Sequence, residues 1–218
     1  MYKQIFLSFA MVSILLMSTV ISSTSVFAAE KGNSRQLCIN ESVIELKYAM
    51  QKLWIEHAWW TRSVIVSRIA DLADKEEVLE RLLQNQEDLG NIIKPYYGEG
   101  AGNKLTEMLK EHIVIAGDII DAAKKGDQKG VDKLNQDWER NANDIVTFLS
   151  DANPYWDKED FTEMFMKHLK LTTDEVIFRL NKDWEEDINT ADINEAHLIK
   201  MGDMLTDGIV KQFPEKFQ

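Results

Sequence analysis

Prolines mark the few places where helices in this chain must stop. Pro95, Pro154 and Pro214 are the only prolines in the 218 residues, and each stands where a run of apolar residues spaced by three and four comes to an end. That spacing is typical of amphipathic helices, and proline inside a helix removes a backbone hydrogen bond. Alternating strand patterns are nearly absent. The sequence therefore predicts an all-α protein.

Six helices are predicted from the apolar spacing and from residues that favour helix ends. Asp74 with Glu77, and Asp192 with Glu195, have the spacing of a capping box. Because the connecting segments are short, we expect an antiparallel up-and-down helical bundle. The predicted helices span residues 41–71, 74–94, 103–125, 127–150, 158–188 and 192–213.

The N-terminal residues have the pattern of a secretory signal peptide. Lys3 precedes an apolar run over residues 5–20, and Val26 and Ala28 are small enough to precede a signal-peptidase cut. An uncleaved membrane anchor is the alternative, and the hydroxyl-rich end of the run argues against it. We predict a signal peptide over 1–28, a flexible segment over 29–40 and one helical-bundle domain over 41–214. The protein is then secreted or associated with the cell envelope.

The charge of the chain disfavours two classes of partner. Cleavage after Ala28 removes a single charge, that of Lys3, and changes the net charge from −12 to −13. A protein this acidic repels phosphate backbones and anionic lipids, so we expect no nucleic-acid binding and no membrane insertion after cleavage. The one cysteine, Cys38, excludes an internal disulfide framework. It is either a spare thiol or the site of an intermolecular disulfide.

Internal repetition is the most informative feature of the sequence. Residues 105–113 match residues 161–169 at an offset of 56, and each segment contains a histidine at the same position, His112 and His168. The segment around His57 matches the first of these at an offset of 55. We interpret the chain as a helical hairpin of about 56 residues that is used nearly three times.

The repeat predicts a polar layer across the bundle. If the hairpins turn near residues 73, 98, 126 and 154, several polar residues lie at similar distances from the turns, within about two helical turns of one another. We expect the three histidines to be buried and to have Asn or Asp neighbours, while His197 lies outside the layer. The predicted polar layer consists of His57, Asn85, Asp88, His112, Asn141, Asp144 and His168.

Two interpretations of this layer remain open. Imidazole and carboxylate groups on facing helices can bind a divalent metal ion, and the candidate ligands are His57, Asp88, His112, Asp144 and His168. Asn85, Asn141, Thr61 and Thr172 are candidates for binding a small polar ligand. The alternative is a hydrogen-bonded layer that only fixes helix register, as in a structural or interaction protein of the cell surface.

Catalysis is the least favoured function. No nucleophile–base pair or acid–base constellation can be assembled from the spacing of residues, so no catalytic residue is assigned. The sequence also lacks the Glu-x-x-His pairs of di-iron bundles. The main hypothesis is an exported, non-enzymatic bundle that binds a metal ion or a small polar ligand at the predicted polar layer.

Several short motifs resemble a family of small secreted bacterial helical proteins of unassigned function. The resemblance covers residues 45–214, and it implies a helical fold but no particular activity. Members sometimes carry the labels glycosyltransferase or acetylglutamate kinase, and this sequence has no strand–helix alternation or glycine-rich nucleotide motif to support either. The motifs are Leu53-Trp54, Glu56-His57, Trp60-Thr61-Arg62, Asn85-Gln86, Asp88, Pro95-Tyr96-Tyr97-Gly98, Ala152-Asn153-Pro154 and Lys211-Gln212-Phe213-Pro214.

The predicted signal peptide leads to a direct measurement. We expect mass spectrometry of the secreted protein to show a chain that begins at Ala29 or within a residue or two of it. Substituting Ala28 with a bulky residue such as Tyr should shift or block the cut, because signal peptidase needs a small residue there. A mature protein that retains residues 1–28 would contradict the prediction.

Overall fold

The computed structural model describes residues 40–218, and within that range the chain is helical throughout, with no strand. The predicted all-α class is confirmed. None of the described helices is long and apolar enough to cross a membrane. The predicted signal peptide, the predicted flexible segment up to residue 39 and Cys38 lie outside the described residues. The helices are α1 (Glu41–Ile69), α2 (Lys75–Lys125), α3 (Gln128–Ala152), α4 (Lys158–Asn181), α5 (Trp184–Gln212) and the short 3-10 helix η1 (Pro214–Phe217).

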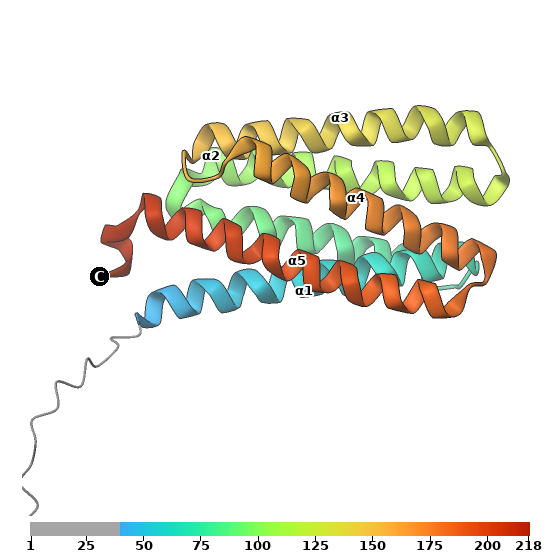
Figure 1. Cartoon of the computed structure of the whole chain (residues 1–218), viewed down its shortest axis with the longest axis horizontal. Coiled ribbons are helices and arrows are strands. Elements are labelled where there is room, and N and C mark those ends of the chain that lie inside the picture. The colour runs from blue at the N-terminus through green and yellow to red at the C-terminus, as the bar shows by residue number, and fades with distance from the viewer. Residues whose placement is uncertain (1–39) are drawn as a thin grey trace, which may run out of the picture. The chain divides into compact units, whose positions relative to one another are not determined.

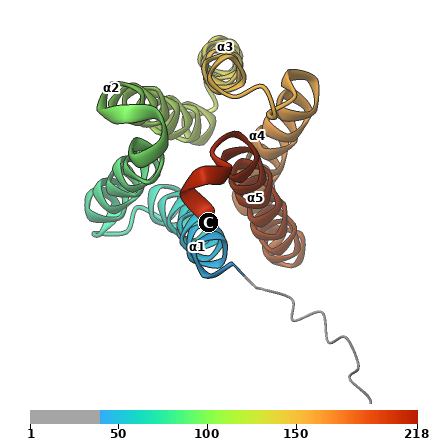
Figure 2. The same ribbon diagram turned by 90° about the vertical axis from the view of Figure 1, so that its left-hand side faces the viewer.

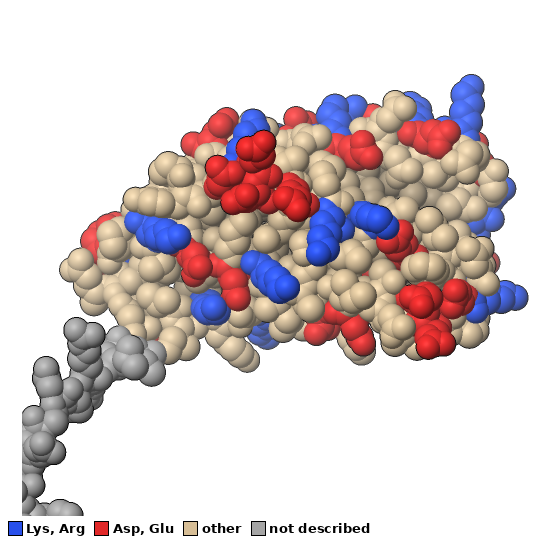
Figure 3. All heavy atoms as spheres, viewed as in Figure 1, with Lys and Arg blue, Asp and Glu red and all other residues tan. Residues whose placement is uncertain are grey.

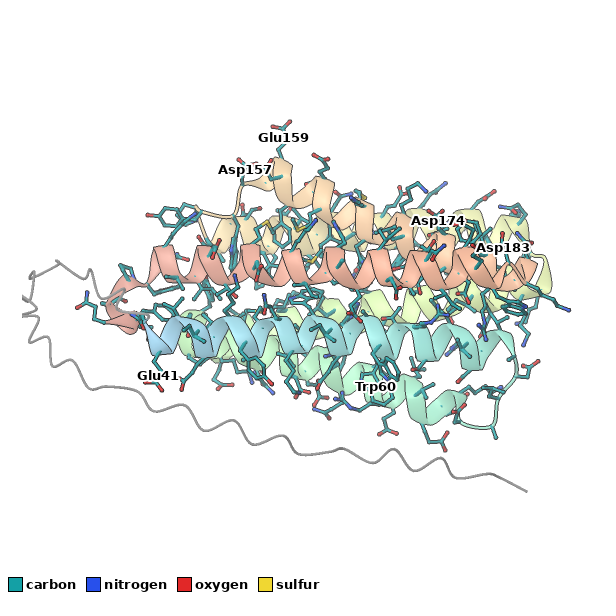
Figure 4. The ribbon with its side chains drawn as sticks, turned by 60° about the horizontal axis from the view of Figure 1, so that its bottom comes forward. Glu41, Trp60, Asp157, Glu159, Asp174 and Asp183 are labelled. Atoms are coloured by element: carbon teal, nitrogen blue, oxygen red, sulfur yellow. The ribbon has the colours of Figure 1, made fainter. Side chains whose placement is uncertain are left out.

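Polar side chains cap the N-terminus of most helices. Asn40 accepts hydrogen bonds from two backbone N–H groups at the start of α1, and Asp127 accepts one at the start of α3. Asp157 and Asp183 cap α4 and α5 in the same way, at the positions labelled in Figure 4. Asp74 precedes α2 but makes no side-chain cap hydrogen bond. These caps satisfy N–H groups that a helix start leaves without partners.

Helix α2 doubles back on itself, so that residues 75–97 and 99–125 form two rods that run in opposite directions (Figures 1 and 2). Gly98 lies at the bend, with φ 83° and ψ 167°, a conformation that strongly favours glycine. Pro95 lies just before the bend. The two rods correspond to the separate helices predicted over residues 74–94 and 103–125. The structure joins them into one element, so the described chain has five α-helices rather than the six predicted.

The two rods of α2 approach each other closely at a pair of glycines. A Cβ atom added to Gly90 would lie 2.5 Å from the carbonyl oxygen of Gly102, and one added to Gly102 would lie 2.6 Å from the carbonyl oxygen of Gly90. Any larger residue would push the backbones apart. Thr106 Oγ1 donates a hydrogen bond to the carbonyl of Gln86 across the same junction, at 3.5 Å.

The remaining helices complete a closed arrangement. Helix α1 packs against α2 and α5, α3 packs against α2 and α4, and α4 packs against α5. The view along the helices in Figure 2 shows this circuit, with α3 on the side opposite α1. On the outside of the α1–α2 contact, the Arg81 guanidinium lies over the ring of Trp60, 5.2 Å from its centre.

One end of the arrangement is joined by a polar network. Asn153, which ends α3, donates a hydrogen bond to Tyr97 Oη at 2.8 Å, and Tyr97 Oη donates one to Gln212 Oε1 at 2.8 Å. Gln212 Nε2 then donates to the carbonyl of Ala152 at 3.1 Å. Three motifs that are far apart in the sequence therefore meet at the bend of α2 and at the C-terminal ends of α3 and α5.

Two groups of buried apolar residues form the core. The larger group runs through all five helices and includes Trp54, Trp156 and Phe161. The smaller group, called here the second core, lies toward the end of the molecule away from the Tyr97 network. It consists of Val64, Ile65, Leu82, Ile113, Ile120 and Val176.

The predicted boundary between the last two helices is wrong. The apolar spacing predicts one helix that continues to residue 188 and another that begins at Asp192, whereas α4 ends at Asn181 and α5 begins at Trp184. Lys182 takes a left-handed conformation with φ 61° and ends α4, and Asp183 caps α5. Asp192 lies inside α5. Lys182 carries none of the glycine or proline signals on which the prediction relied.

Acidic and basic side chains both cover the surface. Figure 3 shows several groups of Asp and Glu with Lys and Arg between them on the face that it displays. Ion pairs between surface side chains include Lys133 Nζ with Asp137 Oδ2 at 2.7 Å. Exposed pairs of this kind contribute little to stability, and the excess of acidic residues sets the net charge of −12.

The bend in α2 can be tested at two glycines that are two residues apart, Gly98 and Gly100. Gly98→Ala should lower the free energy of unfolding by about 1–3 kcal/mol, because its backbone conformation is unfavourable for residues with a Cβ. A Cβ at either Gly98 or Gly100 meets nothing within 4 Å, so backbone conformation is what distinguishes them. Gly100→Ala should be neutral or stabilising by up to ~1 kcal/mol. Equal effects in urea unfolding would show that the bend does not depend on Gly98.

Candidate functional site

Three histidine rings from three different helices meet in the centre of the molecule. His57 on α1, His112 on α2 and His168 on α4 are each only 3% exposed, as expected. The ring centres of His57 and His168 are 5.6 Å apart, and those of His112 and His168 are 6.4 Å apart. We call these three residues the histidine cluster.

His112 is held by an asparagine on the neighbouring helix α3. Its Nδ1 lies 2.8 Å from Asn141 Oδ1, while Asn141 Nδ2 donates to the carbonyl of Met108 at 3.1 Å. Because the NH₂ group of Asn141 faces the Met108 carbonyl, the side-chain oxygen of Asn141 faces the imidazole. That oxygen can only accept a hydrogen bond, so His112 carries its proton on Nδ1. Among the described residues, nothing bonds to the Nε2 of this ring.

His168 is held in the same way by an asparagine of α5. Its Nδ1 lies 3.1 Å from Asn194 Oδ1, and Asn194 Nδ2 donates to Glu175 Oε1 at 2.8 Å. The hydroxyl of Thr172 lies 3.5 Å from the same Nδ1. Since the amide NH₂ of Asn194 is directed to a carboxylate, His168 also carries its proton on Nδ1.

His57 has a glutamine as its partner. Gln86 Nε2 lies 3.3 Å from His57 Nδ1 and also donates to Asn85 Oδ1 at 3.1 Å. Gln86 and Asn85 are both fully buried. The two amide hydrogens of Gln86 have closer acceptors in Asn85 Oδ1 and in the Leu82 carbonyl, which lies 2.8 Å away, so the contact with His57 is the longest of the three.

Side-chain donors also link the helices of each hairpin at corresponding places. Each donor lies on the second helix of a hairpin and reaches a backbone carbonyl on the first, four residues before the histidine of the cluster. The donors lie 56 residues apart along the chain. The bonds are Asn85 Nδ2 to Leu53 at 3.0 Å, Asn141 Nδ2 to Met108 at 3.1 Å and His197 Nε2 to Met164 at 2.8 Å.

Burial keeps the histidine cluster neutral. It lowers the pKa of His112 to about 3 and that of His168 to about 4. The pKa of His57 is also lowered well below its ordinary value, first by burial and then by the neighbouring histidines. A buried imidazole resists protonation because charge is unfavourable away from water.

A charged network continues from His168 toward the surface. Beyond Asn194, Glu175 Oε2 lies 3.6 Å from Arg62 Nη1. Arg62 donates two hydrogen bonds to the carboxylate of Asp187, at 2.8 and 3.0 Å, and one to its backbone carbonyl at 3.3 Å. Burial raises the pKa of Glu175 to about 7, although Asn194 and Arg62 oppose the shift. Burial alone would raise the pKa of Asp187, but the hydrogen bonds from Arg62 and Arg179 hold it below its ordinary value.

The predicted acidic ligands, Asp88 and Asp144, are not among the hydrogen-bond partners of the histidine cluster in the described chain. Asp144 is exposed and Asp88 is partly buried, and neither forms a hydrogen bond with a ring of the cluster among the described residues. Within residues 40–218, no three histidine, cysteine or acidic side chains are arranged to hold a metal ion. Of the predicted ligand residues, Asn141 and Thr172 contact a histidine, Asn85 contacts Gln86, and Thr61 is half-buried one turn away.

Several residues of this site were not predicted. His197 lies 56 residues after Asn141, so the repeat offset could have placed it beside the cluster rather than outside it. Gln86 directly follows the predicted Asn85. Asn194 and Glu175 gave no signal, because their role depends on how α4 and α5 are rotated against each other.

The pH dependence of stability tests the neutral state of the cluster. Each histidine has a folded pKa below its unfolded value of about 6.5, so its contribution is fully present above that pH and is lost as pH falls toward 4. Stability should therefore rise with pH between 4.5 and 6.5, by up to about 1.4 kcal/mol per pH unit for each histidine. Glu175, whose folded pKa is raised, acts in the opposite sense between its unfolded pKa and about pH 7.

Two variants separate these effects in urea unfolding followed by circular dichroism. His112→Gln should flatten the rise of stability with pH, because one of the neutral rings is removed. Glu175→Gln should make the rise steeper, because the opposing carboxyl is removed. A profile that neither substitution changes would show that these groups do not titrate on unfolding.

Comparison with known proteins adds no assignment. No protein-family model, curated protein or solved structure matches the chain. The resemblance based on short motifs therefore stays a prediction.

Proposed function

We propose that this protein is an exported, non-enzymatic antiparallel bundle of three repeated helical hairpins, in which the histidine cluster fixes the register of the hairpins. The observation that carries the proposal is the set of three hydrogen bonds to Leu53, Met108 and Met164 carbonyls, whose spacing along the chain follows the offset of the sequence repeat. Each bond ties the two helices of one hairpin at the level of its histidine.

A register role agrees with the energetics of buried polar groups. An amide in an apolar core is costly unless its donors and acceptors are paired. Sliding α3 by one helical turn relative to α2 would separate Asn141 from both His112 and the Met108 carbonyl. Apolar contacts alone would tolerate such a slip better, because they have no direction.

The electrostatics of the cluster favour a non-enzymatic role. A general base or acid works best when its pKa lies near the working pH. His112 and His168 have pKa values of about 3 and 4, so they neither take up nor release a proton readily near pH 7. The histidine cluster is therefore better suited to packing or binding than to acid–base chemistry, which agrees with a structural or interaction protein of the cell surface.

A metal ion or small polar ligand at the cluster is the second candidate, and one observation favours it. His112 donates its Nδ1 proton to Asn141, which leaves the Nε2 lone pair free of any partner among the described residues. Histidines that bind metals usually donate their other N–H to an acceptor in this way. The ligands would then be imidazoles rather than the predicted carboxylates.

Asparagine substitutions on α3 test the register role. Asn141→Leu should lower the free energy of unfolding by roughly 2–4 kcal/mol, because the N–H of His112 and the carbonyl of Met108 lose their partner. Asn143→Leu is the matched control. Asn143 is exposed and bonds only within its own helix, to Glu139, so its effect should stay within about 0.5 kcal/mol.

Metal analysis of the same proteins, purified without a histidine tag, distinguishes the two candidates. A register role predicts no stoichiometric metal in the wild type and no change in His112→Gln beyond stability. A metal site predicts bound ion that is lost in His112→Gln. Equal stability of the Asn141 and Asn143 variants would contradict the register role whatever the metal content.

A further inference from the structure

Next to the histidine cluster, the molecule contains a cavity of about 330 Å³ between α1, α2, α3 and α4. All six residues of the second core line it, so its deep wall is aliphatic. Trp138 also lines the cavity and stacks on His112, with ring centres 5.1 Å apart. The rim includes the exposed residues Gln128 and Ile177, so the cavity opens near the α2–α3 turn.

Small residues on one helix account for the volume of the cavity. Ala116 and Ala123 face it from the second rod of α2. At the offsets of the sequence repeat, Ala116 corresponds to Thr61 and Thr172, and Ala123 corresponds to arginines on α1 and α4. Of the three related helices, the second rod of α2 therefore carries the shorter side chains at these two positions. Side chains from α1, α3 and α4 do not fill the volume that they leave. Empty apolar volume lowers stability in proportion to its size, a cost that an occupant offsets.

The chemistry of the lining defines the class of occupant. No charged residue lines the cavity among the described residues, so a charged ligand would lose its water without gaining an ion pair. Trp138 is only 4% exposed, and its indole N–H has no acceptor in the described part of the chain. The hydroxyl of Thr61, which also lines the cavity, is likewise without a partner there. Both can hydrogen-bond to a ligand.

We propose that this cavity binds a small, neutral, mostly apolar molecule that has one hydrogen-bond acceptor. The acceptor receives a hydrogen bond from the indole N–H of Trp138. A cavity of about 150 Å³ holds a benzene molecule, so this one suits a molecule of two fused rings. The volume also lies at the lower end of the range for ligand pockets. The binding does not depend on the role proposed for the histidine cluster, because no residue of that cluster lines the cavity.

Three probes that share one fused-ring skeleton test the proposed chemistry by calorimetric titration of the folded protein at pH 7.5. The neutral ketone 1-tetralone should bind most tightly, the hydrocarbon tetralin more weakly, and tetralin-1-carboxylate at least tenfold more weakly than the ketone. Binding of none of the three would overturn the proposal. Tightest binding of the carboxylate would overturn it as well, because it would require a cation that the lining lacks.

Two substitutions locate the site. Ala116→Leu should weaken binding of 1-tetralone at least tenfold by filling the cavity, whereas Ala196→Leu, the same change at an exposed position on α5, should leave it unchanged. Trp138→Phe should weaken binding of the ketone about five- to tenfold and leave tetralin nearly unaffected. Thermal unfolding checks that each variant is folded. Unchanged binding of 1-tetralone in Ala116→Leu would place the probe elsewhere and overturn the proposal. Equal losses of affinity for the ketone and for tetralin in Trp138→Phe would overturn the assigned hydrogen bond.

Discussion

The hydrogen bond between an asparagine side chain and a backbone carbonyl of the neighbouring helix is the interaction on which the centre of this molecule depends. Asn141 donates to the carbonyl of Met108 and accepts from His112, so a single side chain fixes how α3 sits along α2 and how the imidazole is turned. Buried amides and imidazoles are tolerated only when paired. The pairing therefore constrains rotation and translation of the helices together, which apolar side chains alone cannot do.

The two ends of the molecule are built differently. At one end, Tyr97, Asn153 and Gln212 join the bend of α2 to the ends of α3 and α5 by direct hydrogen bonds, and the rings of Trp156 and Phe213 pack against Tyr97. At the other end, the second core surrounds a cavity. The histidine cluster lies between these regions. Because a hydrogen-bonded layer resists sliding of the helices, the end that contains the cavity can keep its shape with less complete side-chain packing.

The network from His168 to Asp187 connects the core to the surface. Asn194 contacts both His168 and Glu175, and Arg62 bridges Glu175 to Asp187. Burial lowers the pKa of His168, so the imidazole stays neutral, and raises the pKa of Glu175, so the carboxyl group is harder to ionise. Arg62 and Arg179 stabilise the charge of Asp187 at the outer part, where the buried carboxylate would otherwise be costly.

The sequence by itself determined the helical class, most helix ends and the histidines that share one level, because apolar spacing, capping residues and the repeat offset act along the chain. It did not determine that Asn194, rather than Asp144, would meet a histidine, or that α4 would end at Asn181, just before Lys182. A rise of about 1.5 Å per residue fixes the level of a side chain but not the direction in which it points toward other helices. The cavity, too, was decided only by tertiary structure, since it is the volume that side chains from four helices together leave unfilled.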